Sequence, residues 1–207
     1  PRAGVVGVRL HGRAGCVKLF YDERWRNRLR TALGFSKGRR AYRNGVCLKE
    51  RGIGCPEMWG YTERRPFGPG MIVTELIDDA VRLGEWVLKH GVSRELIGAL
   101  ARFIRAMHDE GVWHVDLSPR NILVRPRASR FEFLLLDYED ARFARRTSRR
   151  SRLENLHHLH ERMAESTSVR DRLRFLRAYA PPDYRAWRDA LRRMIVQSRR
   201  REDRHTP

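Results

Sequence analysis

Apolar residues near the start of the chain form two short runs of β-strand character, at Val5–Leu10 and Cys16–Phe20. Residues 11–15 between them contain two glycines, which suit a turn, so this segment predicts a β-hairpin. Lys18 lies inside the second run. A later apolar run, at Met71–Leu76, predicts another short strand.

Helical periodicity is clearest between Ser93 and Gly111. Ser93 is a suitable N-cap and Gly111 a suitable stop, so a helix is predicted between them. The apolar residues that recur at helix spacing mark one face of it: Leu96, Ile97, Leu100, Phe103, Ile104 and Met107.

Weaker helical patterns lie on both sides of this helix. Residues 24–43 are basic with apolar residues at helix spacing, and a further helix, marked by Tyr42, Val46 and Leu48, is predicted to end near Gly52. Three C-terminal helices follow a basic connector, residues 142–152, and are predicted at residues 153–163, 169–179 and 184–194.

Two short buried strands, Ile122–Val124 and Phe131–Leu136, are predicted with a turn around Pro126. The segment His114–Asn121 therefore forms a loop between the long helix and the first of these strands. Asp137 comes directly after the second strand. Packed elements of this kind are suitable rigid support for a catalytic site.

The loop and the strand end carry a phosphoryl-transfer pattern. Asp116 can accept a proton from a substrate hydroxyl, while Asn121, five residues later, and Asp137 can hold magnesium on ATP. Lys18 on an early strand suits the ATP phosphates, and backbone groups from Glu75 to Ile77 suit an adenine-binding hinge. This ordered set predicts a nucleotide site, with Lys18, Glu75, Ile77, Asn121 and Asp137 binding the cofactor and Asp116 acting as the base.

Simpler interpretations exist for the same residues. Asp116 and Asn121 could cap backbone groups in a structural turn, and Lys18 could be a solvated strand lysine. The ordered companions favour the catalytic interpretation for the pair. His157, His158 and His160 suit a helix face better than a metal site, since no cysteine or acid stands at ligand spacing with them.

At this point the sequence resembles the lipopolysaccharide core kinases, which phosphorylate Kdo or heptose and have a protein-kinase-like fold. The resemblance covers nearly the whole chain and is carried by the segments Val17–Leu19, Arg40–Arg43, Leu48–Pro56, Ile72–Glu75, His114–Val124, Leu135–Arg142, Asn155–Leu159 and Asp171–Tyr179. Aminoglycoside phosphotransferases share the loop type but usually have a longer helical lobe.

The resemblance implies an α+β, protein-kinase-like two-lobed fold over residues 1–207. We expect a small β-rich first lobe at residues 1–74, a hinge at 75–77 and a mainly helical second lobe at 78–207. It also implies Asp116 as catalytic base, Asn121 and Asp137 as magnesium ligands, and Lys18 as the ATP-phosphate lysine. Arg120, between Asp116 and Asn121, is the best candidate to contact the acceptor.

Three features depart from the family pattern. Ala41 stands where relatives usually place a glutamate to pair with the lysine, and Glu50 lies later on the same predicted helix, so the partner of Lys18 stays open. No first strand or glycine-rich loop is recognisable before Val5, and because the chain starts at Pro1 without methionine, we expect upstream sequence. Glu139 replaces the more usual aspartate two residues after Asp137, so its part as an auxiliary ligand is open.

Net charge adds a partner to this picture. The chain of 207 residues has a formal net charge of +19, and only four of its 44 basic residues are lysines. Such a charge predicts affinity for an acidic partner, and we expect a lipopolysaccharide core or lipid A precursor and an anionic membrane surface rather than nucleic acid. Because arginines are spread along the whole chain, compositional bias explains part of the excess.

Three widely spaced cysteines, none in a C-x-x-C pair, argue against a disulfide framework or a zinc site and fit a reducing cytosol. No apolar run approaches the ~20 residues of a membrane span, and no signal peptide is visible. We expect a cytoplasmic enzyme, peripheral on the inner face of the bacterial inner membrane.

The reaction predicted is ATP- and magnesium-dependent phosphorylation of a Kdo or heptose hydroxyl of the inner core. One alternative is another phosphotransferase of the same fold, acting on a small molecule or a protein. A second is a basic, non-catalytic pseudokinase adaptor, which Ala41 and the missing glycine loop favour and the intact Asp116, Asn121 and Asp137 oppose.

Overall fold

The computed structural model describes residues 3–20, 36–63, 70–128 and 130–180. These fall into two units, one formed by residues 1–80 with 134–142 and the other by residues 81–133 with 143–207. The helical pattern expected before residue 36 and the last C-terminal helix, predicted at 184–194, lie outside the described residues. The lobe boundary at residue 74 and the hinge at 75–77 stay predictions.

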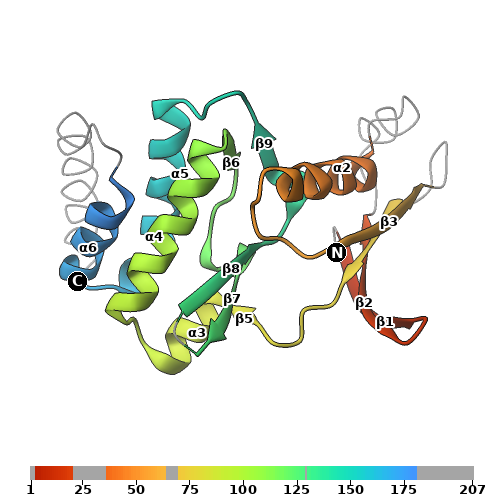
Figure 1. Ribbon diagram of the computed structural model, residues 1–207, viewed down its shortest axis with the longest axis horizontal. Coiled ribbons are helices and arrows are strands. Elements are labelled where there is room, and N and C mark those ends of the chain that lie inside the picture. The colour runs from red at the N-terminus through yellow and green to blue at the C-terminus, as the bar shows by residue number, and fades with distance from the viewer. Residues whose placement is uncertain (1–2, 21–35, 64–69, 129, 181–207) are drawn as a thin grey trace, which may run out of the picture. The chain divides into compact units, whose positions relative to one another are not determined.

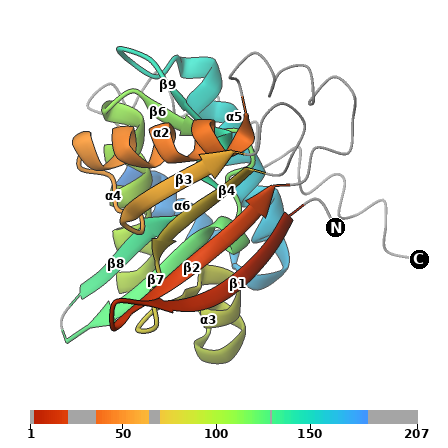
Figure 2. The ribbon, with the colours of Figure 1, turned by 90° about the vertical axis from the view of Figure 1, so that its right-hand side faces the viewer.

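The first unit is built on an antiparallel sheet with the strand order β1-β2-β4-β3 (Figure 2). Its strands are β1 (Ala3–Leu10), β2 (Arg13–Phe20), β3 (Met58–Glu63) and β4 (Gly70–Glu75). The predicted hairpin is confirmed, and its turn is only His11-Gly12, with φ angles of 49° and 79°. Two positive φ angles in a two-residue turn match the twist of the flanking strands.

Strand β3 has no counterpart among the predicted elements. Pro56 precedes it, Gly60 lies within it, and its pairing with β4 shifts register between Met58 and Gly60. These breaker residues hide the strand pattern, whereas the pairing with β4 supplies the backbone partners that hold it.

Helix α2 (Lys37–Glu50) packs on this sheet next to β3 (Figure 2). It begins at Ser36, whose side chain accepts a hydrogen bond from the Arg39 amide at 3.0 Å. Ala41 and Leu48 are fully buried beneath it. Gly45 allows close approach, because a Cβ there would lie 2.5 Å from the Met58 sulfur. The helix ends before Gly52, as predicted.

The second unit contains the helices α3 (Leu83–His90), α4 (Arg94–Asp109), α5 (Arg149–Arg162) and α6 (Val169–Tyr179). Helix α4 confirms the long predicted helix, and the Ser93 side chain caps it by accepting from the Leu96 amide at 3.1 Å. Figure 1 shows α4 alongside α5 and α6. The apolar face of α4 forms the core of this unit with residues of the other two helices: Leu96, Leu100, Ile104, Met107, Leu156 and Leu176.

Short strands complete the second unit. They form a sheet with the order β5-β7-β8, where β5 is Val81–Arg82, β7 is Ile122–Arg127 and β8 is Arg130–Leu135. The last two residues of β8 belong to the first unit. The expected position of the turn, around Pro126, is wrong, because Pro126 lies inside β7, which continues to Arg127. Strand β5 pairs only with Leu123 and Val124, so Pro126 has a neighbour on one side and its missing N–H is tolerated.

The remaining short elements are β6 (Val112–His114), β9 (Ala141–Phe143) and the 3-10 turns Pro119–Asn121, Tyr138–Asp140 and Ala164–Ser166. Helix α5 begins at Arg149, inside the expected connector, because the Ser148 side chain caps it through the Ser151 amide. None of the described helices combines the length and the apolar character needed to cross a bilayer.

Candidate active site

Lys18, Asp137 and Glu139 form an ion cluster in the first unit, called the Lys18 cluster below. The Lys18 Nζ lies 2.6 Å from Asp137 Oδ1 and 2.8 Å from Glu139 Oε1. The lysine side chain is only 17% exposed. Burial by itself lowers the pKa of Lys18, but the charges and hydrogen bonds of Glu139 and Asp137 outweigh it and raise that pKa above its ordinary value. Lys18 is therefore a fixed cation.

The backbone after β8 turns sharply to present the two acids. Asp137 has φ 55° and ψ 50°, the left-handed region that non-glycine residues seldom occupy. Helix α2 holds this turn, because the Asn44 side-chain amide donates to the Tyr138 carbonyl at 2.7 Å and to the Ala141 carbonyl at 3.1 Å. Arg142 also donates to the Glu139 carbonyl, at 3.0 Å.

The structure answers which acid pairs with Lys18. Helix α2 offers Ala41, fully buried, and Glu50 is exposed at its last position. Both partners instead come from the turn after β8, and Glu139 Oε2 is buried without a hydrogen-bond partner. Carboxylate oxygens are the ligands that magnesium prefers, so this orphaned oxygen beside Asp137 fits a divalent cation.

A second group of predicted residues lies in the second unit, in the loop of residues 114–121, called the Asp116 loop below. The Arg120 Nη2 donates to Asp116 Oδ2 at 2.6 Å, and the Asn121 amide nitrogen donates to the Asp116 carbonyl at 2.9 Å. Because Asn121 uses its nitrogen in this way, its oxygen is left for a donor or a metal. The hydrogen bond from Arg120 lowers the pKa of Asp116 below its ordinary value, although burial opposes it.

The start of the Asp116 loop is clamped by a side chain from α5. The Asn155 Oδ1 accepts from the His114 amide at 3.0 Å, and the Asn155 Nδ2 donates to the His114 carbonyl at 2.7 Å. Asn155 and His114 are both buried. The backbone two residues before Asp116 is thus fixed by one amide that supplies both a donor and an acceptor.

Asn155 connects this clamp to α4 and α6 through His108. The His108 Nε2 lies 3.2 Å from Asn155 Oδ1, and its Nδ1 lies 2.7 Å from the Tyr179 hydroxyl. Since an amide oxygen can only accept, Nε2 carries the proton and Nδ1 accepts from Tyr179. Burial lowers the pKa of His108 to about 4 and raises the pKa of Tyr179 to about 12, so the pair is neutral at physiological pH.

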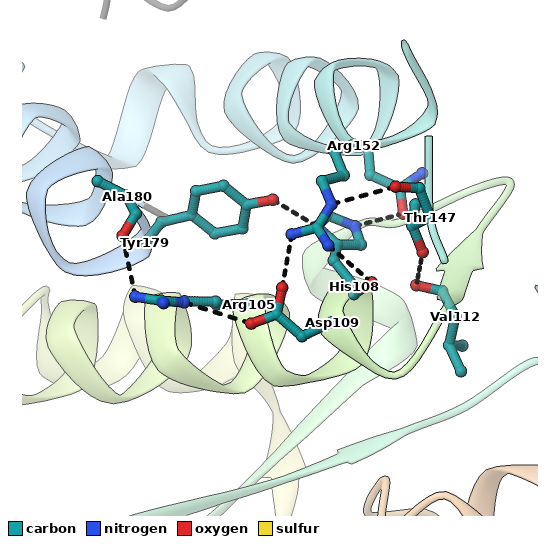
Figure 3. Close-up of polar contacts among 9 residues, drawn as sticks. Arg105, His108, Asp109, Val112, Thr147, Arg152, Tyr179 and Ala180 are labelled. Carbon is teal, nitrogen blue, oxygen red and sulfur yellow. Dashed lines mark hydrogen bonds and ion pairs between the residues drawn. The ribbon is translucent and has the colours of Figure 1, made fainter. Parts of the chain in front are cut away.

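Arg152 of α5 extends this network along the end of α4 (Figure 3). It donates to Asp109 at 2.8 Å and to the His108 carbonyl at 3.0 Å. Arg105 joins α4 to the end of α6 by donating to the Ala180 carbonyl at 2.9 Å, and Thr147 donates to the Val112 carbonyl at 3.3 Å. Three helices therefore support the strand that leads into the Asp116 loop.

The hinge residues predicted for adenine lie at the end of β4. The Glu75 amide donates to the Glu57 carbonyl at 2.9 Å, and the Leu76 amide donates to the Ala14 carbonyl at 3.1 Å. These bonds fix the backbone direction up to Ile77, which is half-buried. The segment is thus ordered by neighbouring strands rather than by its own side chains.

The structure thus gathers the predicted residues into two groups. Lys18 and Asp137 meet in one unit, and Asp116, Arg120 and Asn121 meet in the other. Sequence reasoning missed the polar residues Asn44, His108 and Arg152 that support them, and it considered Glu139 only as an auxiliary ligand, not as a partner of Lys18. Asn155 lies in a segment that resembles the family, but the sequence predicts no role for it. A side chain that binds the backbone amide and carbonyl of a distant residue produces no recognisable sequence spacing.

The fold is that of the protein-kinase-like phosphotransferases, as predicted. The solved structure titled "WaaP in complex with acyl carrier protein" covers 98% of this chain and 85% of that chain, with a TM-score of 0.73 and 23% identity. An aminoglycoside-3'-phosphotransferase of type VIII covers 93% of this chain and 88% of that one, with a TM-score of 0.58 and 18% identity. No curated protein is recognisably similar to the chain in sequence.

The chain belongs to the lipopolysaccharide kinase (Kdo/WaaP) family, whose model matches residues 6–179. It is accordingly a lipopolysaccharide sugar kinase, a phosphotransferase with a hydroxyl acceptor. The resemblance inferred from the sequence is confirmed, and membership of this family favours an enzyme over a non-catalytic adaptor.

Proposed function

We propose that this protein transfers the γ-phosphoryl group of ATP, with magnesium, to a Kdo or heptose hydroxyl of the lipopolysaccharide inner core. The observation that carries the proposal is the bond between Lys18 and Asp137. These residues are 119 positions apart in the sequence, yet the Lys18 Nζ lies 2.6 Å from Asp137 Oδ1. The lysine is the residue assigned to the ATP phosphates, and the aspartate is the residue assigned to the metal. This contact argues against the simpler interpretation of Lys18 as a solvated strand lysine, because the side chain is mostly buried and paired.

Each predicted residue has a part in this proposal. Lys18 would hold the phosphates, and Asp137 and Asn121 would supply oxygens to the metal, with the unpartnered Glu139 oxygen as a further ligand. The backbone from Glu75 to Ile77 would contact the adenine edge through groups other than the Glu75 and Leu76 amides, which bond to Glu57 and Ala14. Magnesium, when bound, neutralises charge on the phosphates.

Asp116 accepts the proton of the acceptor hydroxyl. A base of this kind must be an ionised carboxylate when the acceptor arrives, and the pKa of Asp116, which the Arg120 hydrogen bond lowers from an already acidic value, meets that condition at neutral pH. The Asn155 clamp limits its movement, so the carboxylate stays in one place relative to its own unit. Arg120, bonded to that carboxylate, is placed to contact the acceptor.

The partner surface in this proposal is the anionic inner leaflet of the bacterial inner membrane, with the chain peripheral and cytoplasmic. The net charge of +19 supports it. Each basic residue near such a surface contributes about 1 kcal/mol of binding free energy.

An Asp116→Asn variant tests the reaction. We expect transfer of labelled phosphate from ATP to core oligosaccharide to fall about 10²–10⁴-fold, the usual contribution of general acid–base catalysis, with nucleotide binding retained. Glu154→Gln, which removes an exposed carboxylate of α5, is the matched control and should keep full activity. Transfer by Asp116→Asn at the unaltered rate would disprove the assigned base. Acceptors ending in Kdo and in heptose, assayed in parallel, identify the sugar.

A further inference from the structure

An arginine-lined pocket of about 310 Å³ opens in the second unit beside the Asp116 loop. Its walls come from the loop itself, from the start of α3 and from the last residue of α5. The lining residues used below are Arg82, Gly84, Glu85, Ser118, Arg120 and Arg162. A volume of this size suits a ligand of about one sugar ring with its substituents.

The pocket has an excess of cationic side chains. Arg82, Arg120 and Arg162 line it with one acidic residue, Glu85, while Asp116 pairs with Arg120. The Glu85 carboxylate lies 3.8 Å from Arg82, and both side chains are more than half exposed, so their attraction is weak. Guanidinium groups bind carboxylates and phosphates through paired, charge-assisted hydrogen bonds, so the lining selects an oxyanion.

The backbone at one wall also favours an anion. Arg82 is the N-cap of α3 and makes no side-chain cap, so the helix begins without a side-chain acceptor for its first amides. Gly84, in the first turn, lines the pocket, and the N-terminal end of a helix carries partial positive charge.

Ser118 provides an independent sign of a ligand. The residue is 1% exposed, it lines the pocket, and its hydroxyl has no hydrogen-bond partner. Buried hydroxyls nearly always have a partner, because leaving one unpaired costs free energy. An oxyanion in the pocket gives this hydroxyl an acceptor.

We propose that the arginine pocket binds an oxyanion, carboxylate or phosphate, carried by the acceptor sugar. This inference rests on the proposed function and deepens it, since it makes the acceptor an anionic sugar and Arg82, Arg162 and Ser118 its specificity residues. Arg120 links the pocket to the chemistry, because it lines the pocket and also donates to Asp116.

Binding of the acceptor without ATP tests the pocket. The probes are the methyl glycoside of Kdo, the methyl ester of that glycoside, a heptose phosphate and the unphosphorylated heptose, each titrated into the whole chain. We expect the unaltered protein to prefer the charged member of each pair. Arg82→Gln and Arg162→Gln should each weaken the charged probe about tenfold, equivalent to ~1.4 kcal/mol, and leave the neutral probe unchanged. Ser118→Ala should weaken the charged probe alone.

Arg150→Gln is the matched control, since Arg150 is an exposed arginine of α5 that pairs with Glu154. It removes the same charge away from the pocket and should leave all four affinities unchanged. Whichever pair shows the larger preference identifies the carboxylate or the phosphate as the recognised group. Equal binding of charged and neutral probes, or equal losses in Arg150→Gln and Arg162→Gln, overturns the proposal.

Kinase assays with the same sugars separate this proposal from the proposed function. If charged sugars bind through the arginines but receive no phosphate from ATP, the pocket stands and the reaction is wrong. If phosphate is transferred equally to the charged and the neutral member of both pairs, the reaction stands and the pocket is wrong.

Discussion

At the scale of single residues, the Lys18 cluster shows what spacing can and cannot predict. Strand position and motif order in the sequence are enough to predict Lys18 and Asp137 as site residues. They do not predict that Glu139 pairs with Lys18, because Asp137 adopts a left-handed conformation that no sequence pattern indicates at a non-glycine residue. That conformation, held by Asn44, turns both acids toward the same lysine.

Replacing Lys18 should lower the rate of phosphoryl transfer. In Lys18→Met, the phosphates lose their cation and the two carboxylates lose theirs, so we expect phosphoryl transfer to fall at least ~10²-fold, comparable to loss of one electrostatic stabiliser. Steady-state kinetics with ATP and core oligosaccharide provide the measurement. Lys89→Met, in the last turn of α3, removes a lysine outside the cluster and should be silent. Equal activity of the two variants contradicts the role given to Lys18.

At the scale of elements, the strongest predictions came from long, capped and periodic segments. Helix α4 carries a serine cap and a continuous apolar face, and it was predicted almost to its ends. Helix α3 has eight residues and no side-chain cap, so periodicity had too little chain to appear. The links among α4, α5 and α6 depend on buried polar partners far apart in sequence, which no local pattern shows.

The neutral, buried His108, which links α4 to α5 and α6, makes the stability of the fold sensitive to acid. Its pKa is about 4 in the folded chain and near 6.5 when unfolded, so the folded state disfavours the proton. The contribution of neutral His108 to the stability of the folded chain is complete above about pH 6.5 and is lost as pH falls from there toward 4. The change is on the order of 3 kcal/mol in the free energy of unfolding.

Urea unfolding of His108→Gln beside the unaltered chain, between pH 7 and pH 4, checks this expectation. Glutamine cannot titrate, so the variant's free energy of unfolding should fall less steeply over that interval. His158→Gln, an exposed histidine of α5, is the control and should leave the slope unchanged. Parallel slopes for His108→Gln and the unaltered chain count against a neutral, buried His108.

At the scale of the whole molecule, the fold class was predictable because the motifs occur in a fixed order along the chain. Each motif alone is a weak signal, but their order along the chain is that of one fold. The order is the strand with Lys18, the hinge at 75–77, the loop of residues 114–121 and Asp137. The details of each unit, such as the register at β3 and the source of the Lys18 partners, depend on packing between distant segments.

The net charge of +19 predicts salt-sensitive attachment to anionic bilayers. We expect co-sedimentation with vesicles containing phosphatidylglycerol and little with pure phosphatidylcholine. Raising salt from ~0.05 M to ~0.5 M should release the protein, because the screening length shortens about threefold over that range. Binding to both vesicle types that persists in salt contradicts a charge-driven attachment.

The Lys18 cluster runs against this general charge. One ammonium opposes two carboxylates, so the cluster is locally anionic inside a cationic chain. Under the proposed function, a free nucleotide, itself a polyanion, is repelled by such a cluster, whereas a divalent cation is attracted to it. We therefore expect the nucleotide to bind as its metal complex and metal-free ATP to be a poor competitor.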